Sequence, residues 1–263
     1  MSPTPIRQVL STMQKHQVQA LLMGGQACVF YGAAQFSKDI DLLLLADEAN
    51  FAGLQSALDE LGAHRIAVPG FDPAALARGH ALHFRCQSGD AKGLRINVMT
   101  RLRDFPPFEA LWNRRTTVVD EDGTEVSLLS VEDLVKAKKT QRDKDWPMIG
   151  ALVEGHYKAT GNSPNPDRIK FWLTETRTPE RLLDLVSRFA EESHALLPRR
   201  PLLGLAMAGD LPRLREALDA EVRAEQERDR TYWQPLKREM EAFRRAQREE
   251  EEQAGNRKAE TGT

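Results

Sequence analysis

The sequence is poor in cysteine, almost neutral overall and without a long apolar run. Its two cysteines, Cys28 and Cys86, lie in apolar surroundings without a Cys-x-x-Cys spacing, which favours buried free thiols over a disulfide or a zinc site. The net charge of -2 does not indicate that the chain as a whole binds nucleic acid, although a local basic patch is compatible with this net charge. No apolar run approaches the roughly 20 residues of a membrane span, and the N-terminus lacks a signal-peptide core. We therefore expect a cytoplasmic protein with no membrane partner.

The length of 263 residues and the hydrophobic content of 41% are sufficient for one sizeable domain and an appendage. Apolar periodicity and turn residues predict an α/β (α+β) fold, with a small, mixed, twisted sheet flanked by helices. The predicted elements include a helix over 3–15, a helix from the Asp47 cap to Leu61, a short helix begun by Asp72-Pro73, a hairpin of 82–86 with 93–99, and a second hairpin over 116–128 that turns at Asp122-Gly123.

A change of composition near residue 163 predicts a boundary between two regions. The segment GNSPNPD is rich in glycine, proline and asparagine, as linkers are. We assign residues 1–162 to the α/β domain and 163–263 to a helical C-terminal region. The last long helix of that region should be broken or kinked near Pro235. It leads into a charged tail that we expect to be mobile.

The most informative stretch is 18–45, VQALLMGGQACVFYGAAQFSKDIDLLLL. It predicts a short strand ending at Gly24-Gly25, a helix to about Ala34, and a strand that carries Asp39 and Asp41. Alternation along a strand places both aspartates on one face, where their charges require compensation. Mg²⁺, which prefers oxygen ligands, would supply it. The glycines would let a phosphate approach the backbone N–H groups at the start of the helix. Taken alone, the Gly-Gly pair also fits a plain turn, and the Asp-x-Asp pair also fits a solvated strand end.

Together, these residues resemble the signature of the DNA polymerase beta-like nucleotidyltransferases, in particular the bacterial minimal and abortive-infection-toxin (AbiEii-like) branch. The resemblance covers Gly24-Gly25, Tyr31-Gly32 and Ser37-Lys38-Asp39-Ile40-Asp41. It implies a nucleotidyltransferase fold, in which Gly24, Gly25, Ser37 and Lys38 hold a nucleoside triphosphate and Asp39 and Asp41 bind Mg²⁺ or Mn²⁺. The family often has an arginine two residues before the serine, and this chain has Gln35 there.

The third acidic position of the family falls, by strand alternation, on Asn97. An asparagine can ligate a cation through its carbonyl oxygen but cannot accept a proton from a nucleophile. We therefore expect nucleotide binding to persist and transfer to be slow, unless Asp104 or Asp90 substitutes. Two alternatives stay open: an engineered change at this position, or a strand register that is off by one.

Downstream, Ser130 and Asp133 form a capping pattern, and the following helix is expected to present Lys138 and Arg142 on one face. The resemblance implies that Lys138, with Arg142 and Lys144 nearby, neutralises the triphosphate. Asp145 would instead cap or anchor the next helix. Without the resemblance this segment is a solvated basic helix.

Two other sets of residues have a functional and a structural interpretation. The arginines of segment 101–115 either line an entrance for a polyanion or flank a helix packed by Trp112; they are Arg101, Arg103, Arg114 and Arg115. The histidines His64, His80 and His83 lack metal-ligand spacing, and we interpret them as surface or core residues.

The sequence thus predicts a Mg²⁺-dependent nucleotidyltransferase that moves a nucleoside monophosphate from a triphosphate such as ATP to a hydroxyl. The acceptor would be an RNA end, a protein or a small molecule, and the branch it resembles suggests a toxin-antitoxin relation. Asp39, Asp41 and Asn97 are the predicted catalytic residues. The alternative is a nucleotide-binding or partner-binding homologue that has lost catalysis, with the helical C-terminal region as its contact surface.

Overall fold

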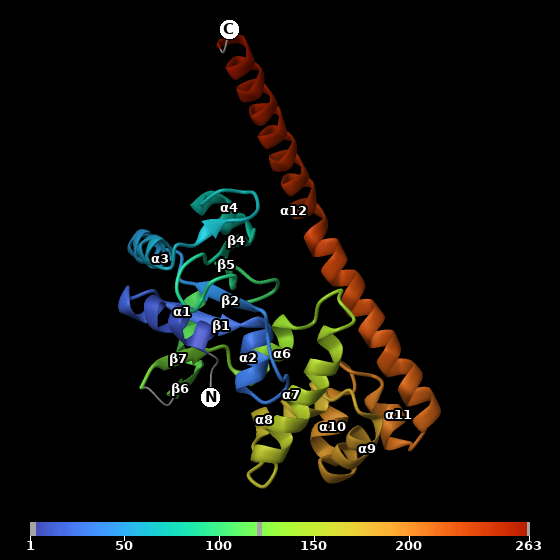
Figure 1. Ribbon diagram of the computed structural model, residues 1–263. Helices are drawn as coiled ribbons and strands as arrows, with labels where there is room; N and C mark the ends of the chain where they lie inside the picture. The colour runs from blue at the N-terminus through green and yellow to red at the C-terminus, as the bar shows by residue number, and fades with distance from the viewer. Residues whose placement is uncertain (1–3, 120–122, 262–263) are drawn as a thin grey trace.

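A computed structural model describes residues 4–119 and 123–261, and it confirms the mixed α/β architecture (Figure 1). A mixed sheet of seven strands has the order β3-β4-β5-β2-β1-β7-β6. The strands are β1 (Ala20–Met23), β2 (Asp39–Leu44), β3 (His64–Arg65), β4 (Leu82–Arg85), β5 (Arg95–Met99), β6 (Thr116–Val119) and β7 (Glu125–Leu128).

Helices flank the sheet and then form the whole C-terminal region. Those of the first part are α1 (Thr4–Lys15), α2 (Gly24–Phe30), α3 (Glu48–Glu60), α4 (Pro73–Arg78), α5 (Phe108–Asn113), α6 (Val131–Ala137) and α7 (Asp145–Thr160). Those of the second part are α8 (Pro166–Glu175), α9 (Pro179–Arg188), α10 (Ala190–Leu196), α11 (Leu203–Met207) and α12 (Leu211–Thr261). Within the described residues, no helix combines the length and apolarity that a bilayer crossing requires.

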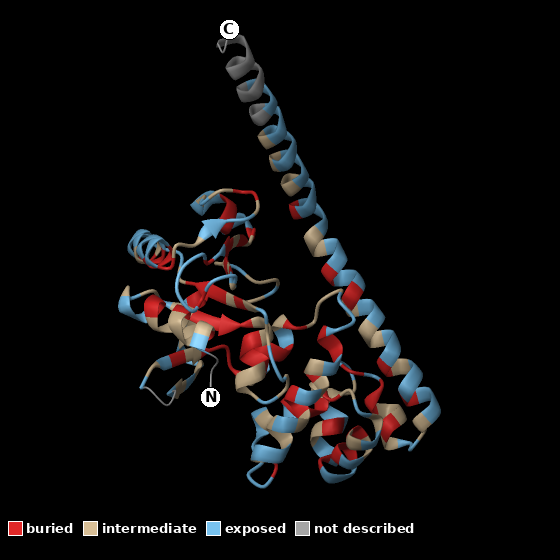
Figure 2. Cartoon of the chain, in the orientation of Figure 1, coloured by how far each residue is buried: buried red, intermediate tan, exposed pale blue. Residues whose placement is uncertain are grey.

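The centre of the sheet is β1 and β2, which pair antiparallel, with β5 parallel to β2 on its other side. These strands are short and apolar, and their buried side chains are the middle of the hydrophobic core (Figure 2). Along β2 the burial alternates as predicted, because Ile40 and Leu42 are buried while Asp39 and Asp41 lie on the other face. Cys28 and Cys86 are buried and free, as the sequence predicted.

Most of the predicted local structure is confirmed. The two hairpins form as β4 with β5 and β6 with β7, although Asp122 of the second turn lies outside the described residues. The Asp47 carboxylate accepts a hydrogen bond from the Asn50 N–H and so caps α3. Asp72 caps α4 in the same way, through the Ala74 N–H.

Two predicted helix boundaries are wrong, and a third helix is unbroken where the sequence indicated a break or a kink. Helix α2 ends at Phe30 instead of about Ala34, since the chain turns at Tyr31 and enters a positive φ of 72° at Gly32. Helix α6 ends at Ala137, so Lys138 and Arg142 do not share a helix face but belong to the loop before α7. Helix α12 is not broken at Pro235: it continues as one helix to Thr261.

Helix α12 brings the end of the chain back to the sheet. Figure 1 shows it rising from α11 and running past the loops of the first part. Glu225 of α12 forms an ion pair with Arg103 of the loop after β5, with an Nη2 to Oε1 distance of 2.6 Å. Farther along, the Glu239 carboxylate contacts the Arg78 guanidinium and the His80 imidazole at 2.9 Å each. The two parts of the sequence therefore meet along this helix.

Candidate functional site

The Gly24-Gly25 turn sits directly against the carboxylate edge of β2. Met23 at the end of β1 is paired with Asp41. Gly24 has φ of +69°, and a Cβ built there would lie 1.9 Å from Oδ2 of Asp41. A Cβ on Gly25 would lie 2.8 Å from the Ser37 hydroxyl oxygen. Only glycine fits at Gly24, and the two glycines let Asp41 and Ser37 lie close to the backbone of the turn.

The strand register places four polar side chains in two pairs across β2 and β5. Asp39 is opposite Arg95, and Asp41 is opposite Asn97. The Arg95 guanidinium donates two hydrogen bonds to the Asp39 carboxylate, each of 2.8 Å. This pairing raises the pKa of Arg95 above its already high value. Asn97 therefore lies directly opposite Asp41, as alternation along the strand predicted, which removes the alternative of a register error.

A histidine orients the amide of Asn97. Nδ1 of His83 lies 2.7 Å from Oδ1 of Asn97, and the Nδ2 group of Asn97 donates to Oδ1 of Asp41 at 2.9 Å. With the His83 N–H donating, the amide nitrogen is directed at Asp41. His83 is half-buried, which is compatible with a surface or core residue, and it contacts the candidate site through Asn97.

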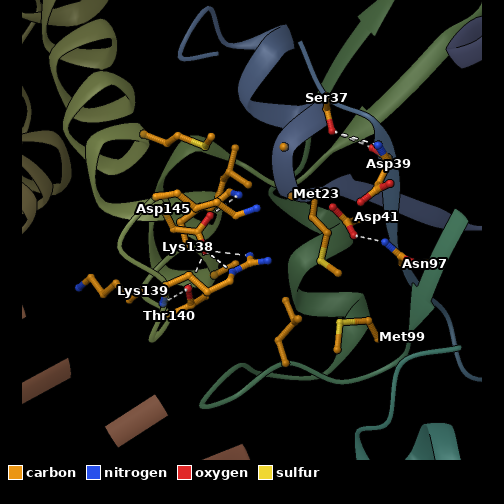
Figure 3. A pocket seen from close by; sticks show the side chains of 18 of the residues that line it. Met23, Ser37, Asp39, Asp41, Asn97, Met99, Lys138, Lys139, Thr140 and Asp145 are labelled. Atoms are coloured by element: carbon orange, nitrogen blue, oxygen red, sulfur yellow. Dashed lines mark hydrogen bonds and ion pairs between the residues drawn. The ribbon is translucent and has the colours of Figure 1, made fainter. Parts of the chain in front are cut away.

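The opposite wall is the loop between α6 and α7, which is built around Asp145 (Figure 3). The Asp145 carboxylate accepts hydrogen bonds from the Lys138 ammonium at 3.0 Å, the Thr140 hydroxyl at 2.6 Å and the Arg142 guanidinium at 2.8 Å. Burial alone would raise the pKa of Asp145, but the Lys138 and Arg142 charges and the Thr140 hydrogen bond outweigh it, and the pKa is lowered. The sequence predicted that Asp145 caps or anchors the next helix, but not that it pairs with Lys138 of the preceding loop.

A cavity of about 610 Å³ lies between these two walls. Figure 3 shows Asp39, Asp41 and Asn97 on one side and Lys138, Thr140 and Asp145 on the other. Every residue predicted for the site lines this cavity: Gly24, Gly25, Ser37, Lys38, Asp39, Asp41, Asn97, Lys138, Arg142 and Lys144. The fold thus brings together four separate segments of the sequence, although the chemical role of each residue stays a prediction.

Several lining residues were missed or were assigned differently from sequence. Arg95 was not predicted for the site, because its partner depends on which strand lies beside β5. Asp229 and Trp233 of α12 also line the cavity, and no local pattern marks them. Of the four arginines in 101–115, Arg103 lines the cavity.

Two of the other arginines in that region have structural partners. Arg114 pairs with Asp133 at 2.6 Å, and the Arg115 guanidinium stacks on the Trp112 ring at 4.0 Å. Asp90 and Asp104 are not among the described residues that line the cavity, so neither adds a carboxylate to it.

The Lys138–Asp145 pair should be the main structural support of this wall. Lys138 is 5% exposed and Asp145 is 1% exposed. Replacing Asp145 with asparagine would leave a buried ammonium without its counter-charge, and we expect a loss of about 3–5 kcal/mol in the free energy of unfolding. Because the pKa of Asp145 is lowered in the folded state, its contribution is present above the unfolded-state pKa. The difference between wild type and Asp145→Asn should therefore shrink as the pH falls below about 4.

Urea unfolding at pH 7 and at pH 3 measures both effects. Asp143→Asn is the matched control, since Asp143 lies in the same loop but is exposed and accepts its hydrogen bond from Gln226 of α12. An Asp145→Asn variant as stable as Asp143→Asn at pH 7 would contradict this account of the loop.

Comparisons with known proteins do not assign a function to the chain. No protein-family model matches the chain, and no curated protein matches it. Among solved structures, the chain is similar to a crystal structure from H. pylori that is described provisionally as a nucleotidyltransferase. That similarity has 16% sequence identity and a TM-score of 0.39, over 86% of this chain and 94% of that chain. A similarity this low carries no argument about activity.

Proposed function

We propose that the cavity binds a nucleoside triphosphate with Mg²⁺ or Mn²⁺, and that the chain transfers the nucleoside monophosphate to a hydroxyl. One observation carries this proposal: two adjacent carboxylates face a wall of basic side chains across a cavity, with a glycine turn beside the carboxylates. Carboxylates suit a hard cation, and a basic wall suits phosphate groups. A site for a small neutral ligand would need neither.

The donor set fits one cation better than two. Asp39 and Asp41 offer carboxylate oxygens, and the phosphates of the nucleotide would complete the coordination. Within the described residues, no group of three acidic, histidine or cysteine side chains is placed to hold a metal ion. Asn97 adds an uncharged amide, whose nitrogen faces Asp41. A second cation would therefore be held weakly.

Arg95 must release Asp39 for the cation to bind there. Its side chain is 46% exposed, so it has room to rotate away from the strand. An exposed ion pair of this kind contributes about 0–1 kcal/mol, which a divalent cation bound with a triphosphate can exceed. Once released, Arg95 would lie beside the bound phosphates as a further positive charge.

In the proposed reaction, the acceptor hydroxyl oxygen forms a bond to the α-phosphorus while the bond from that phosphorus to pyrophosphate breaks. Gly24, Gly25, Ser37 and Lys38 would hold the phosphates in line for the attack. The Lys138, Arg142 and Lys144 charges lie on the other wall and would stabilise the leaving pyrophosphate. Bound metal supplies further neutralisation of the developing negative charge.

The proton of the acceptor hydroxyl has no carboxylate to receive it at position 97. Asn97 cannot act as a base, and Asp41 is already hydrogen bonded to it. The proton would pass to solvent, which predicts slow transfer. The proposal includes the class of acceptor, which would be an RNA end, a protein hydroxyl or a small molecule. It also includes a toxin-antitoxin role. Both parts rest on the sequence resemblance.

A second function is favoured by the same observations. Arg95 already neutralises Asp39, Asn97 replaces an acid, and Gln35 stands where the family it resembles often has an arginine. A protein that binds the nucleotide as a ligand and signals to a partner through its helical region would keep the cavity and need no base.

Parallel reactions with two labelled forms of each triphosphate separate the two functions. A nucleotidyltransferase transfers a label on the α-phosphorus to an acceptor and releases a γ-label as pyrophosphate, and both products should disappear in Asp41→Asn. Nucleotide binding without either product, for every acceptor class supplied, would contradict the enzyme and support the binding protein.

A further inference from the structure

The C-terminal helix α12 contributes one end of the nucleotide cavity. Asp229 and Trp233 are one helical turn apart, so they lie on the same face of α12, and both line the cavity. The Arg103–Glu225 ion pair fixes the helix one turn earlier. We infer that the indole of Trp233 is the surface on which the nucleobase stacks, an inference that rests on the function proposed above.

The Asp229 carboxylate stabilises the part of the cavity wall that α12 forms, because its charge is already engaged by neighbouring groups. Its carboxylate is 4% exposed. One oxygen accepts the Gln141 N–H at 2.9 Å, and the other accepts the Trp233 indole N–H at 3.1 Å. Nε of Arg103 lies 3.6 Å away and balances its charge. An acidic residue beside a triphosphate cavity is therefore compatible with the ligand.

The same hydrogen bonds orient Trp233 before any ligand arrives. Its indole N–H donates to Asp229, and Asp229 also accepts a hydrogen bond from the backbone of the loop between α6 and α7, which we call the basic loop. A side chain fixed in this way loses little conformational entropy when a planar ring stacks on it. Asp229 is thus a positioning residue, and Trp233 is the residue that touches the base.

The other aromatic side chains of the cavity are less suited to this role. Phe105 has the Lys136 ammonium 4.5 Å from its ring centroid, so it already has a charged partner. Phe36 lines the cavity but is 70% exposed, and it precedes Ser37, which is proposed to bind phosphate. Trp233 is half-buried, and it belongs to α12, whereas the phosphate-binding residues belong to the sheet edge and the basic loop.

Calorimetric titrations with Mg²⁺-ATP and with Mg²⁺-tripolyphosphate test the inference, since the second ligand lacks a base. We expect Trp233→Ala to weaken ATP binding about tenfold, which corresponds to about 1.4 kcal/mol, and to leave tripolyphosphate binding unchanged. Trp233→Phe should restore most of the loss. Phe243→Ala is the matched control, because Phe243 is another half-buried aromatic residue of α12, its ring contacts His80, and it is not among the described residues that line the cavity.

The outcomes separate this inference from the proposed function. If wild-type protein binds neither ligand, the proposed function fails and the inference fails with it. If both ligands bind and Trp233→Ala weakens both equally or neither, the inference alone is wrong, and Trp233 is only a structural residue.

Should Trp233→Ala fail to fold, tryptophan fluorescence replaces it: ATP should quench the wild-type emission and leave Trp233→Phe unquenched. Equal quenching in the two proteins would overturn the inference.

Discussion

The Asp41→Asn variant is expected to lose Mg²⁺-dependent binding of nucleoside triphosphates. The substitution keeps the shape of the side chain and removes the charge that faces both Gly24 and Asn97. Removing a group that only supports a metal ligand costs roughly 10- to 100-fold, so the loss of a ligand should weaken binding by at least about 100-fold. The fold should persist, because the asparagine oxygen can still accept the hydrogen bond from Asn97.

Titration of the variant with each triphosphate, with Mg²⁺ and with EDTA, measures this effect. Asp90→Asn is the matched control, since it removes one carboxylate from a turn next to β5 that does not contribute to the described lining of the cavity. If Asp41→Asn binds as tightly as Asp90→Asn, Asp41 is not a metal ligand.

The Asn97→Asp variant is expected to raise the transfer rate by about 100-fold, the lower end of the range for an added general base. Position 97 is directly opposite Asp41 on the neighbouring strand, so the new carboxylate would stand beside the first two. His83 would remain as a hydrogen-bond partner for it. The metal-free variant should melt at a lower temperature than wild type, because like charges face each other, and Mn²⁺ should stabilise it more.

Initial rates of label transfer and melting temperatures with and without Mn²⁺ test both parts. Asn113→Asp, at the end of α5 and away from the described lining of the cavity, adds the same charge elsewhere. If Asn97→Asp gains metal affinity but no transfer, the missing base is not what limits the reaction, and the binding protein is the better interpretation.

The sequence predicted the glycine and carboxylate side of the cavity because that side is encoded locally. A strand, a glycine turn and a second strand within 18–45 need no distant residue, and alternation along β2 places Asp39 and Asp41 on one face. The same rule put Asn97 on the matching face of β5. It gave the correct register, since Ile96 and Val98 had to face the core.

The rest of the site depends on contacts between distant segments. Arg95 neutralises Asp39 only because β5 lies parallel to β2, and this pairing has no local signal. The basic residues were expected on one helix face, but Asp145 gathers Lys138, Thr140 and Arg142 into a loop instead.

Helix α12 was the largest departure. Pro235 indicated a break or a kink, and the helix is not broken there but continues to Thr261. Farther back on the same helix, Asp229 and Trp233 reach the cavity. Their place follows from packing along the whole C-terminal region, which local patterns do not describe.

Calorimetric titration of the wild-type chain with Mg²⁺-bound nucleoside triphosphate is the most direct test of the central claim, which is that the cavity between β2 and the basic loop holds a triphosphate and its cation. We predict one binding site per chain, with affinity that depends on Mg²⁺ or Mn²⁺ and falls as salt is added, because phosphate and basic side chains attract each other. Binding that is absent for every triphosphate, or that is unchanged when the metal is removed with EDTA, would contradict the claim.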